Sequence, residues 1–219
     1  MLNALRLNRI YLAECIGSFA LVFCGTGAII INDQTNGQVT HVGIAMTFGL
    51  IVLAMIYAFG SLSGAHLNPA VTIGFLISGR FKLQFLLPYV VFQILGALLA
   101  SLLLQILFPE NINLGATIPS GSMMQSFILE LILSLLLMLV IINVSHGSKE
   151  KGMMAGIAVG ATVGLEALFA GPISGASMNP ARSLAPALVS GNLSQLWIYL
   201  IAPVLGAILA AVICKLFEE

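Results

Sequence analysis

Two copies of one short motif hold the most distinctive polar chemistry of this sequence. Residues 63–70 read Ser-Gly-Ala-His-Leu-Asn-Pro-Ala and residues 174–181 read Ser-Gly-Ala-Ser-Met-Asn-Pro-Ala, so the motif occurs once in each half of the chain. Asn is a favoured N-cap residue, and Pro suits the first helical turn because its missing N–H has no partner there. Each motif therefore predicts the start of a helix, whose N-terminus carries a positive dipole end. Arg182 directly follows the second motif and adds a full positive charge.

The segments behind the motifs are too short to cross a bilayer. About ten mainly apolar residues follow each Asn-Pro pair, at 70–77 and 181–189, which is enough for a half-helix only. Entering from opposite faces, two such half-helices meet N-terminus to N-terminus near the bilayer centre. Irregular backbone at that depth must line a cavity or be buried in protein, and the pattern favours a water-filled path. Arg182 fits the same site, since a lone Arg in an apolar segment must face a cavity or partners.

The rest of the chain supplies membrane-spanning helices that position these motifs. Hydrophobic residues make up 59% and charged residues only 7%, with a mean hydropathy of +1.09, whereas soluble domains average about 25% charged residues. A bilayer core about 30 Å thick needs roughly 20 apolar residues per helix. Six stretches meet that length, near 10–31, 41–60, 85–108, 122–143, 152–171 and 195–216. We predict an all-α membrane protein with a single domain over 1–219.

The halves of the chain, about 8–110 and 120–217, repeat beyond the motifs. Leu95-Gly96-Ala97 corresponds to Leu205-Gly206-Ala207, and Gly43-Ile44-Ala45 corresponds to Gly156-Ile157-Ala158. Each half holds three spans, and three is odd, so the second half enters the membrane from the opposite side. This predicts an inverted repeat with its functional site at the midplane, at the interrupted segments.

The distribution of basic residues predicts the orientation. Seven of the eight Lys and Arg fall on one side: Arg6, Arg9, Arg80, Lys82, Lys149, Lys151 and Lys215. The opposite loops, near 32–40, 109–121 and 190–194, hold none. The positive-inside rule therefore places both termini in the cytoplasm. Cys15, Cys24 and Cys214 lie within predicted helices, which favours small core residues over a disulfide framework.

These motifs, in matching positions of an inverted six-helix repeat, resemble the aquaporins of the major intrinsic protein family over essentially the whole chain. The stretch from Asn179 to Gly191 and residues 196–203 are similar to nodulin-like intrinsic proteins and their bacterial aquaglyceroporin-like relatives. The resemblance implies the aquaporin fold, with six transmembrane helices and two re-entrant half-helices. It also implies a passive pore in which Arg and the half-helix dipoles exclude protons and cations.

The resemblance further assigns individual residues. The Asn side chains would donate amide hydrogens to passing water as well as cap their helices. The two Asn-Pro-Ala loops are Asn68, Pro69, Ala70, Asn179, Pro180 and Ala181. The four expected selectivity-filter residues are Phe48, Ala167, Ala176 and Arg182.

Three further residues are expected to support the loops. Glu14 and Glu130 occupy corresponding places in the halves, and resemblance implies that each carboxylate accepts hydrogen bonds from loop backbone; proton relay is the alternative use of a membrane carboxylate. His66 is expected to brace its loop and to present a polar edge to the inner pore. Glu166 adjoins a filter position, and because one residue turns a helix by about 100°, we expect it to point away from the pore toward loop backbone or a neighbouring helix.

The expected filter suggests a broad range of permeants. Strict water channels usually carry His where this chain has Ala167 and a larger polar residue where it has Ala176, whereas many glycerol channels have Asp where it has Ser183. We expect a channel for water, glycerol and neutral boric, silicic or arsenous acid. Resemblance also implies a homotetramer in the plasma or inner membrane, in contact with lipid. Small residues allow either subunit contacts or contacts inside one chain: Gly96, Ala97, Gly206 and Ala207.

Other classes of function fit the sequence less well. A strict water channel is the first alternative, and a coupled transporter of a small solute is more remote because the chain lacks the membrane acids that such coupling uses. An intramembrane serine protease needs a Ser and a His on facing helices, yet His41 and His146 fall at loop edges and His66 lies in the repeat. Arg182 and the two positive helix ends disfavour a cation channel. We expect no enzymatic activity, cofactor, metal ion or nucleic-acid partner.

Overall fold

The computed structural model describes the backbone of residues 2–145 and 149–218 and the side chains of residues 7–145 and 153–217. This part of the chain is helical and contains no β-strand. Six long helices are α1 (Leu2–Gln34), α2 (Thr40–Ser63), α4 (Leu86–Leu107), α5 (Met123–Val144), α6 (Lys149–Ser174) and α8 (Leu196–Glu218). Each is long and apolar enough to cross a membrane, which confirms the six predicted spans.

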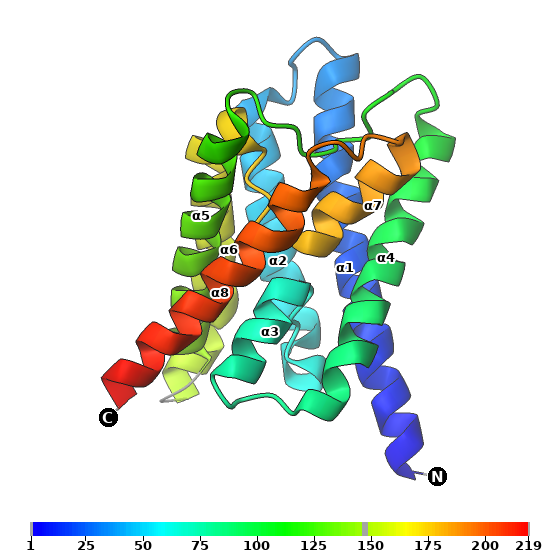
Figure 1. Ribbon diagram of the computed structural model, residues 1–219. Coiled ribbons are helices and arrows are strands. Elements are labelled where there is room, and N and C mark those ends of the chain that lie inside the picture. The colour runs from blue at the N-terminus through cyan, green and yellow to red at the C-terminus, as the bar shows by residue number, and fades with distance from the viewer. Residues whose placement is uncertain (1, 146–148, 219) are drawn as a thin grey trace.

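Two short helices begin at the Pro of each motif. These are α3 (Pro69–Ile77) and α7 (Pro180–Ser190), and a 3-10 turn, η1 (Leu83–Phe85), precedes α4. Figure 1 shows α3 and α7 between the long helices, each entering from one end of the molecule toward its middle. At 1.5 Å per residue α3 is only about 14 Å long. The predicted half-helices are therefore confirmed, and neither is long enough to cross a bilayer.

The long helices pair as an inverted repeat requires. In the first half α1 packs on α4, in the second half α5 packs on α8, and α2 packs on α6 between the halves. Helix α1 begins and helix α8 ends at the same end of the molecule, and the loop from α3 to α4 lies at that end too (Figure 1). Of the basic residues used for the orientation, the side chains of Arg6, Lys149 and Lys151 lie outside the described residues, as does His146.

Glycines at equivalent places allow the closest helix contacts. A Cβ on Gly96 of α4 would lie 2.0 Å from the Cys15 carbonyl oxygen of α1, and one on Gly206 of α8 would lie 2.2 Å from the Leu131 carbonyl oxygen of α5. The adjacent Ala97 and Ala207 are also buried. Of the two uses expected for these small residues, the structure shows contacts within one chain, so they give no support to a subunit interface.

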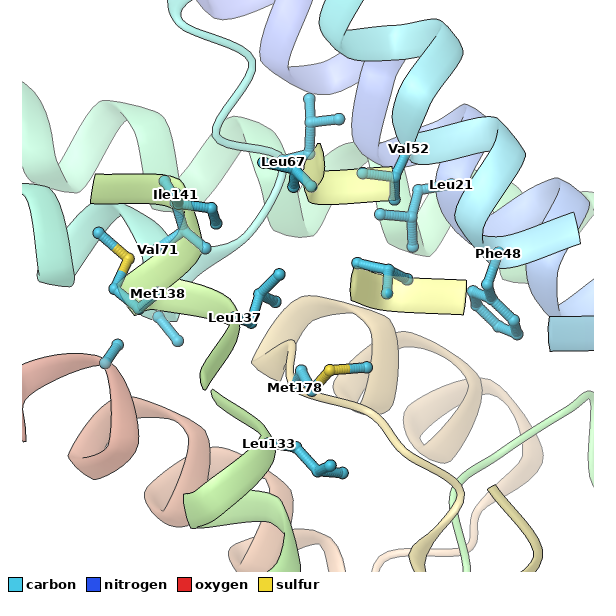
Figure 2. Packing of buried hydrophobic residues seen from close by; sticks show 14 of the residues in the cluster. Leu21, Phe48, Val52, Leu67, Val71, Leu133, Leu137, Met138, Ile141 and Met178 are labelled. Carbon is cyan, nitrogen blue, oxygen red and sulfur yellow. The ribbon is translucent and has the colours of Figure 1, made fainter. Parts of the chain in front are cut away.

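Apolar side chains line the interior and also cover the outside. Figure 2 shows Phe48 and Val52 of α2 and Leu137 and Ile141 of α5 around a common central space, with Met178 of the second motif loop beside them. Large apolar side chains on the outward faces are exposed on all six long helices, as expected of helices in contact with lipid. Examples are Leu12, Val42, Leu99, Ile132, Leu165 and Leu209.

Candidate functional site

The two motif loops meet where α3 and α7 begin, and their Asn side chains connect them. Asn68 caps α3 by accepting a hydrogen bond from Ala70 N at 2.8 Å, and its Nδ2 donates to the Met178 carbonyl of the other loop at 2.7 Å. Asn179 caps α7 through Ala181 N at 3.0 Å, and its Nδ2 donates to the Leu67 carbonyl at 2.9 Å.

This reciprocal bracing leaves donor capacity at the centre. An amide nitrogen carries two N–H groups, and the bond to the opposite loop uses one of them at Asn68 and one at Asn179. Both residues line the same internal cavity. Each Asn can therefore cap its helix, tie the loops together and still donate to a molecule in the cavity. The cross-bracing was not expected from the sequence.

The loops reach this geometry through left-handed backbone. A left-handed conformation is unstrained for Gly but costs about 1 kcal/mol or more for other residues. Residues with positive φ are Gly64 (86°), Ala65 (46°) and Leu67 (53°) in the first loop, and Gly175 (85°), Ala176 (41°) and Met178 (53°) in the second. In such a turn the backbone N–H groups have no hydrogen-bond partner within a helix or strand. At membrane depth they therefore need other acceptors.

Glu14 of α1 provides the acceptors for the first loop. It accepts hydrogen bonds from Ser63 Oγ at 2.7 Å, His66 N at 3.0 Å and Leu67 N at 2.8 Å. A fourth bond comes from Gln93 Nε2 of α4 at 2.8 Å. The Glu14 side chain is fully buried, so these contacts account for a carboxylate that would otherwise be very unfavourable in the membrane.

Glu130 of α5 holds the second loop in the same way. It accepts from Ser174 Oγ at 2.7 Å, Ser177 N at 2.8 Å and Met178 N at 2.8 Å, and it is also fully buried. These contacts have the geometry expected for loop support. No described His or acid continues a hydrogen-bond chain from Glu130, which disfavours a proton relay.

Two tyrosines donate hydrogen bonds to the first Ser carbonyl of each motif loop, and sequence reasoning missed both. Tyr89 Oη donates to the Ser63 carbonyl at 2.8 Å, and Tyr199 Oη donates to the Ser174 carbonyl at 2.7 Å. Each tyrosine follows the first Ser of its motif by nearly the same distance in sequence. A search for polar residues that repeat at the spacing of the two motifs would have found this pair. It would not have found Gln93, which has no polar counterpart.

His66 contacts its own half-helix and the cavity. Its Nδ1 lies 3.2 Å from Thr72 Oγ1, and its ring stacks on Phe75 with centroids 4.6 Å apart. His66 also lines the cavity on the side of the molecule that holds α3. These contacts brace the loop against α3 and leave His66 in the cavity wall.

Arg182 lies in the first turn of α7 and is 2% exposed. Its Nη1 donates to the Gly115 carbonyl at 3.0 Å, and its Cζ lies 5.0 Å from the centre of the Phe48 ring. The Phe48 ring lies directly against α1, since a Cβ on Gly25 would be 2.1 Å from it. The segment around Gly115 belongs to a loop that the sequence analysis treated only as a connection. A guanidinium has five N–H donors, so Arg182 keeps donors for a passing molecule.

The structure brings three of the four expected filter residues together. Phe48, Ala176 and Arg182 line the cavity. Ala167 is buried in the same apolar cluster but is not among the residues that line the cavity. Glu166, beside it, is also not among the residues that line the cavity. Neither carboxyl oxygen of Glu166 has a hydrogen-bond partner in the described part of the chain, so the structure shows no hydrogen bond from it to loop backbone or to a neighbouring helix.

From Phe48, Ala176 and Arg182 the cavity continues toward the end of the molecule where α1 begins. Its α2 wall runs from Phe48 to Ile56, which corresponds to about 12 Å along the helix. Except for Arg182, the two Asn, His66 and the hydroxyls of Ser145 and Ser177, its side chains are apolar. The other wall residues include Leu21, Val52, Leu137, Ile141, Val144, Ser145, Ala155, Val159 and Val163.

Six spans and two opposed half-helices around a mainly apolar path define a membrane channel of the inverted-repeat type. Residues 1–214 match the family "Major intrinsic protein", and the chain belongs to this family. It is therefore a multi-pass membrane protein and a passive channel for water and small neutral solutes, not an enzyme.

Known relatives agree in sequence and in fold. The chain is 49% identical to Aquaporin NIP1-1 of Zea mays over 91% of its own length and 71% of the relative, and 44% identical to Nodulin-26 of Glycine max over 91% and 74%. Among solved structures it is similar to the aquaglyceroporin from Plasmodium falciparum, with a TM-score of 0.82, 29% identity, and coverage of 96% and 98% of the two chains. The resemblance to nodulin-like aquaporins is thereby confirmed.

Proposed function

We propose that this channel passes glycerol and the neutral acids of boron, silicon and arsenic as well as water, and that it excludes protons and ions. The observation that carries the proposal is the group of Phe48, Ala176 and Arg182 at the cavity wall. One side of this group is apolar and the other is a hydrogen-bond donor. A polyol has the matching character, since its carbon side can slide along Phe48 while its hydroxyls accept from Arg182. Ala176 leaves room for a molecule wider than water.

Charge exclusion follows from the same elements. The N-termini of α3 and α7 point at one region, and each is equivalent to roughly half a positive charge. Arg182 adds a full charge at the start of α7. A cation entering this path loses its hydration and meets positive potential, whereas a neutral molecule finds donors at Asn68, Asn179 and Arg182.

The assembly and location that we propose rest on family membership. The chain forms a homotetramer with one pore per subunit, in the lipid of a plasma or inner membrane. Its 219 residues make a single channel domain. Arg80 and Lys82 fall between α3 and η1, and Lys215 falls in the last turn of α8. Both segments lie at the end of the molecule where α1 begins (Figure 1), and the positive-inside rule makes that end cytoplasmic.

Stopped-flow light scattering on proteoliposomes tests the permeant range. Water, glycerol and boric acid gradients are compared with empty liposomes, and all three fluxes should exceed the lipid background. Water flux without glycerol or boric acid flux would identify a strict water channel. Accumulation of a solute against its gradient when a proton or sodium gradient is imposed would instead identify a coupled transporter.

A further inference from the structure

The last two turns of α6 contain a proline that removes a backbone hydrogen bond. Pro172 lies inside α6. Because proline has no backbone N–H, the carbonyl of Leu168, four residues earlier, loses the donor that an α-helix normally supplies, and the proline ring also crowds that carbonyl. Leu168 lies on the exposed outward face of the helix, where lipid offers no hydrogen-bond donor. Its carbonyl therefore needs a donor from elsewhere in the protein.

His41 of α2 supplies a donor at this place. Its Nε2 lies 2.6 Å from the Leu168 carbonyl oxygen. A carbonyl oxygen can only accept a hydrogen bond, so this contact requires a proton on Nε2. The two residues are 127 positions apart in the sequence, and the bond joins α2 of the first half to α6 of the second half.

The backbone next to Pro172 makes room for the imidazole ring. Gly171 has no Cβ, and a Cβ built there would lie 2.8 Å from His41 Cε1, which is too close for a stable contact. Any larger residue at this position would push the ring away from the Leu168 carbonyl. Three residues thus form one arrangement, in which Pro172 removes a donor, His41 replaces it and Gly171 leaves the space for it.

The corresponding parts of the first half have neither the proline nor the donor. Residues 56–63, at the end of α2, contain no proline. The alignment of Gly43 with Gly156 pairs His41 with Met154, whose side chain has no N–H or O–H donor. The repeated fold therefore does not require a donor at this place, and the donor occurs in the half that contains Pro172.

The segment that His41 contacts leads directly into the second motif loop. Helix α6 ends at Ser174, the first residue of that loop, and Leu168 lies about 9 Å along the helix before this end. Tyr199 Oη donates to the Ser174 carbonyl at 2.7 Å. His41 thus holds the helix on one side of Pro172, and Tyr199 holds it on the other side.

We propose that His41 is a positioning residue of the channel, whose Nε2–H takes the place of the N–H that Pro172 lacks and thereby holds the end of α6. His41 is not among the residues that line the cavity, so it acts on the path through α6. The second motif loop, which follows α6, contains Ala176 of the cavity wall. The effect on transport rests on the proposed role of that loop in selecting permeants, whereas the effect on α6 does not.

A cycle of variants tests the link between His41 and Pro172 without any permeant. His41→Leu keeps much of the bulk of the ring but removes the donor, and its unfolding temperature in detergent should fall by about 2 to 4 °C, the shift expected for one hydrogen bond in a chain of this size. In the background of Pro172→Ala, which restores the backbone N–H, the same change should have less than about half that effect. An unchanged temperature in His41→Leu, or an equal fall in both backgrounds, would overturn the proposal.

Transport through the same variants tests the positioning. The ratio of glycerol to water permeability should change by about twofold to tenfold in His41→Leu, the range that one hydrogen bond gives in a rate. His41→Gln, whose amide also donates, and the double variant with Pro172→Ala should both restore the parental ratio. A parental ratio in His41→Leu, or an altered ratio that persists in the double variant, would contradict the positioning role. A parent that passes no glycerol would refute the proposed permeant range alone, and water flux would then replace the ratio.

A matched control is a second hydrogen bond from an α2 side chain to an α6 carbonyl. Tyr57 Oη donates to the Met153 carbonyl at 2.9 Å, but Ile157, one turn later, still has its backbone N–H. Tyr57→Phe should therefore lower the unfolding temperature by less than His41→Leu does, and by the same amount with and without Pro172→Ala. A dependence on Pro172 as large as that of His41→Leu would show that the coupling is not specific to His41.

Nitrogen NMR of isotope-labelled histidine in the lipid-embedded protein tests the proton directly. At alkaline pH, where an imidazole is neutral, His41 should carry its proton on Nε2, and its signals are identified by their loss in His41→Gln. A proton on Nδ1 instead would overturn the proposal, because Nε2 could not then donate to the Leu168 carbonyl. This measurement decides the question if His41→Leu yields no folded protein.

Discussion

At the level of single residues, the central Asn pair shows how one side chain serves several needs at once. Asn68 satisfies a helix N-terminus through its oxygen and the opposite loop through its nitrogen, and Asn179 does the same in reverse. Polar groups at membrane depth must be satisfied internally. Because these bonds hold the amides in place, any remaining N–H has a fixed direction, and a passing molecule meets a preorganised donor.

The positive charge of Arg182 is expected to act as a barrier. Arg182→Val removes that charge and the bond to Gly115 but keeps the two helix N-termini. The variant should leak protons or small cations while neutral flux persists. Proton flux into liposomes that contain a pH-sensitive dye measures the leak, with water flux as the control. Equal proton flux in parent and variant would show that Arg182 is not the barrier.

The size of the filter residues is expected to set the permeant range. Ala167→His together with Ala176→Thr adds bulk beside Phe48 and Arg182, because Ala176 lines the cavity with them and Ala167 is buried in the same apolar cluster. A clash of about 2 to 3 kcal/mol during passage lowers a flux by roughly 30-fold to 150-fold. Glycerol and boric acid permeability should fall by far more than water permeability, measured by stopped flow.

Overpacking is the hazard of this double substitution, since each enlargement can destabilise the fold by about 1 to 3 kcal/mol. Size-exclusion chromatography and thermal unfolding in detergent check that the variant is folded before transport is compared. A folded variant with parental glycerol and boric acid permeability would contradict the role of these two alanines in selection.

At the level of elements, close helix crossings determine where the half-helices lie. Helices α1 and α4 touch at Gly96, and α5 and α8 touch at Gly206, so each half forms a rigid pair of helices. Glu14 and Glu130, which hold the loops, lie on α1 and α5 of these pairs. The distance between the helices of a pair therefore sets the position of the loop that it carries.

Enlarging Gly96 is expected to disturb this arrangement. In Gly96→Ala the new methyl carbon would lie 2.0 Å from the Cys15 carbonyl oxygen, which is backbone and cannot turn aside. The helices must separate, and stability should fall by about 1 to 3 kcal/mol, seen as a lower unfolding temperature in detergent together with reduced water flux. In Gly27→Ala, a matched change on α1, the nearest contact is 3.5 Å, an ordinary one. Equal stability of the two variants would argue against the crossing.

For the molecule as a whole, the apolar exterior makes the chain a membrane protein and leaves its faces open to lipid or to other copies. The glycines and alanines that could have served subunit contacts are used inside the chain. The proposed tetramer must therefore form through the outward apolar faces of the helices.

Assembly can be measured directly. Chemical cross-linking in the membrane and mass measurement in mild detergent should give a species of four chains. Each chain should conduct by its own path, so mixing parent with an inactive variant should reduce flux in proportion to the fraction of inactive chains. Only monomer at high protein concentration would contradict the tetramer.

Reporter fusions test the predicted orientation of the chain in the membrane. A reporter enzyme that is active only in the cytoplasm, fused after residue 219, should be active, and one that is active only outside the cytoplasm should not be. The same pair of fusions placed in the loop between α7 and α8, at residues 191–195, should give the reverse result. Identical results at both places would refute the predicted topology.

The spans, the half-helices and their inverted arrangement could all be predicted from the amino-acid sequence. Lipid admits few backbone solutions, so about 20 apolar residues predict a helix and a Pro-led segment half that length predicts a re-entrant one. The repeat of Asn68 and Asn179 related the halves. The resemblance to the aquaporins implied that Glu14 and Glu130 support the loops, and a charged group at membrane depth needs such partners.

The groups that meet across the halves could be identified only in the folded chain. Asn68 with the Met178 carbonyl, and Arg182 with the Gly115 carbonyl, are contacts between segments far apart in sequence, and a backbone carbonyl has no signature in the residue type. Which side chains of α6 reach the path depends on helix tilt and rotation, which packing sets and periodicity leaves open.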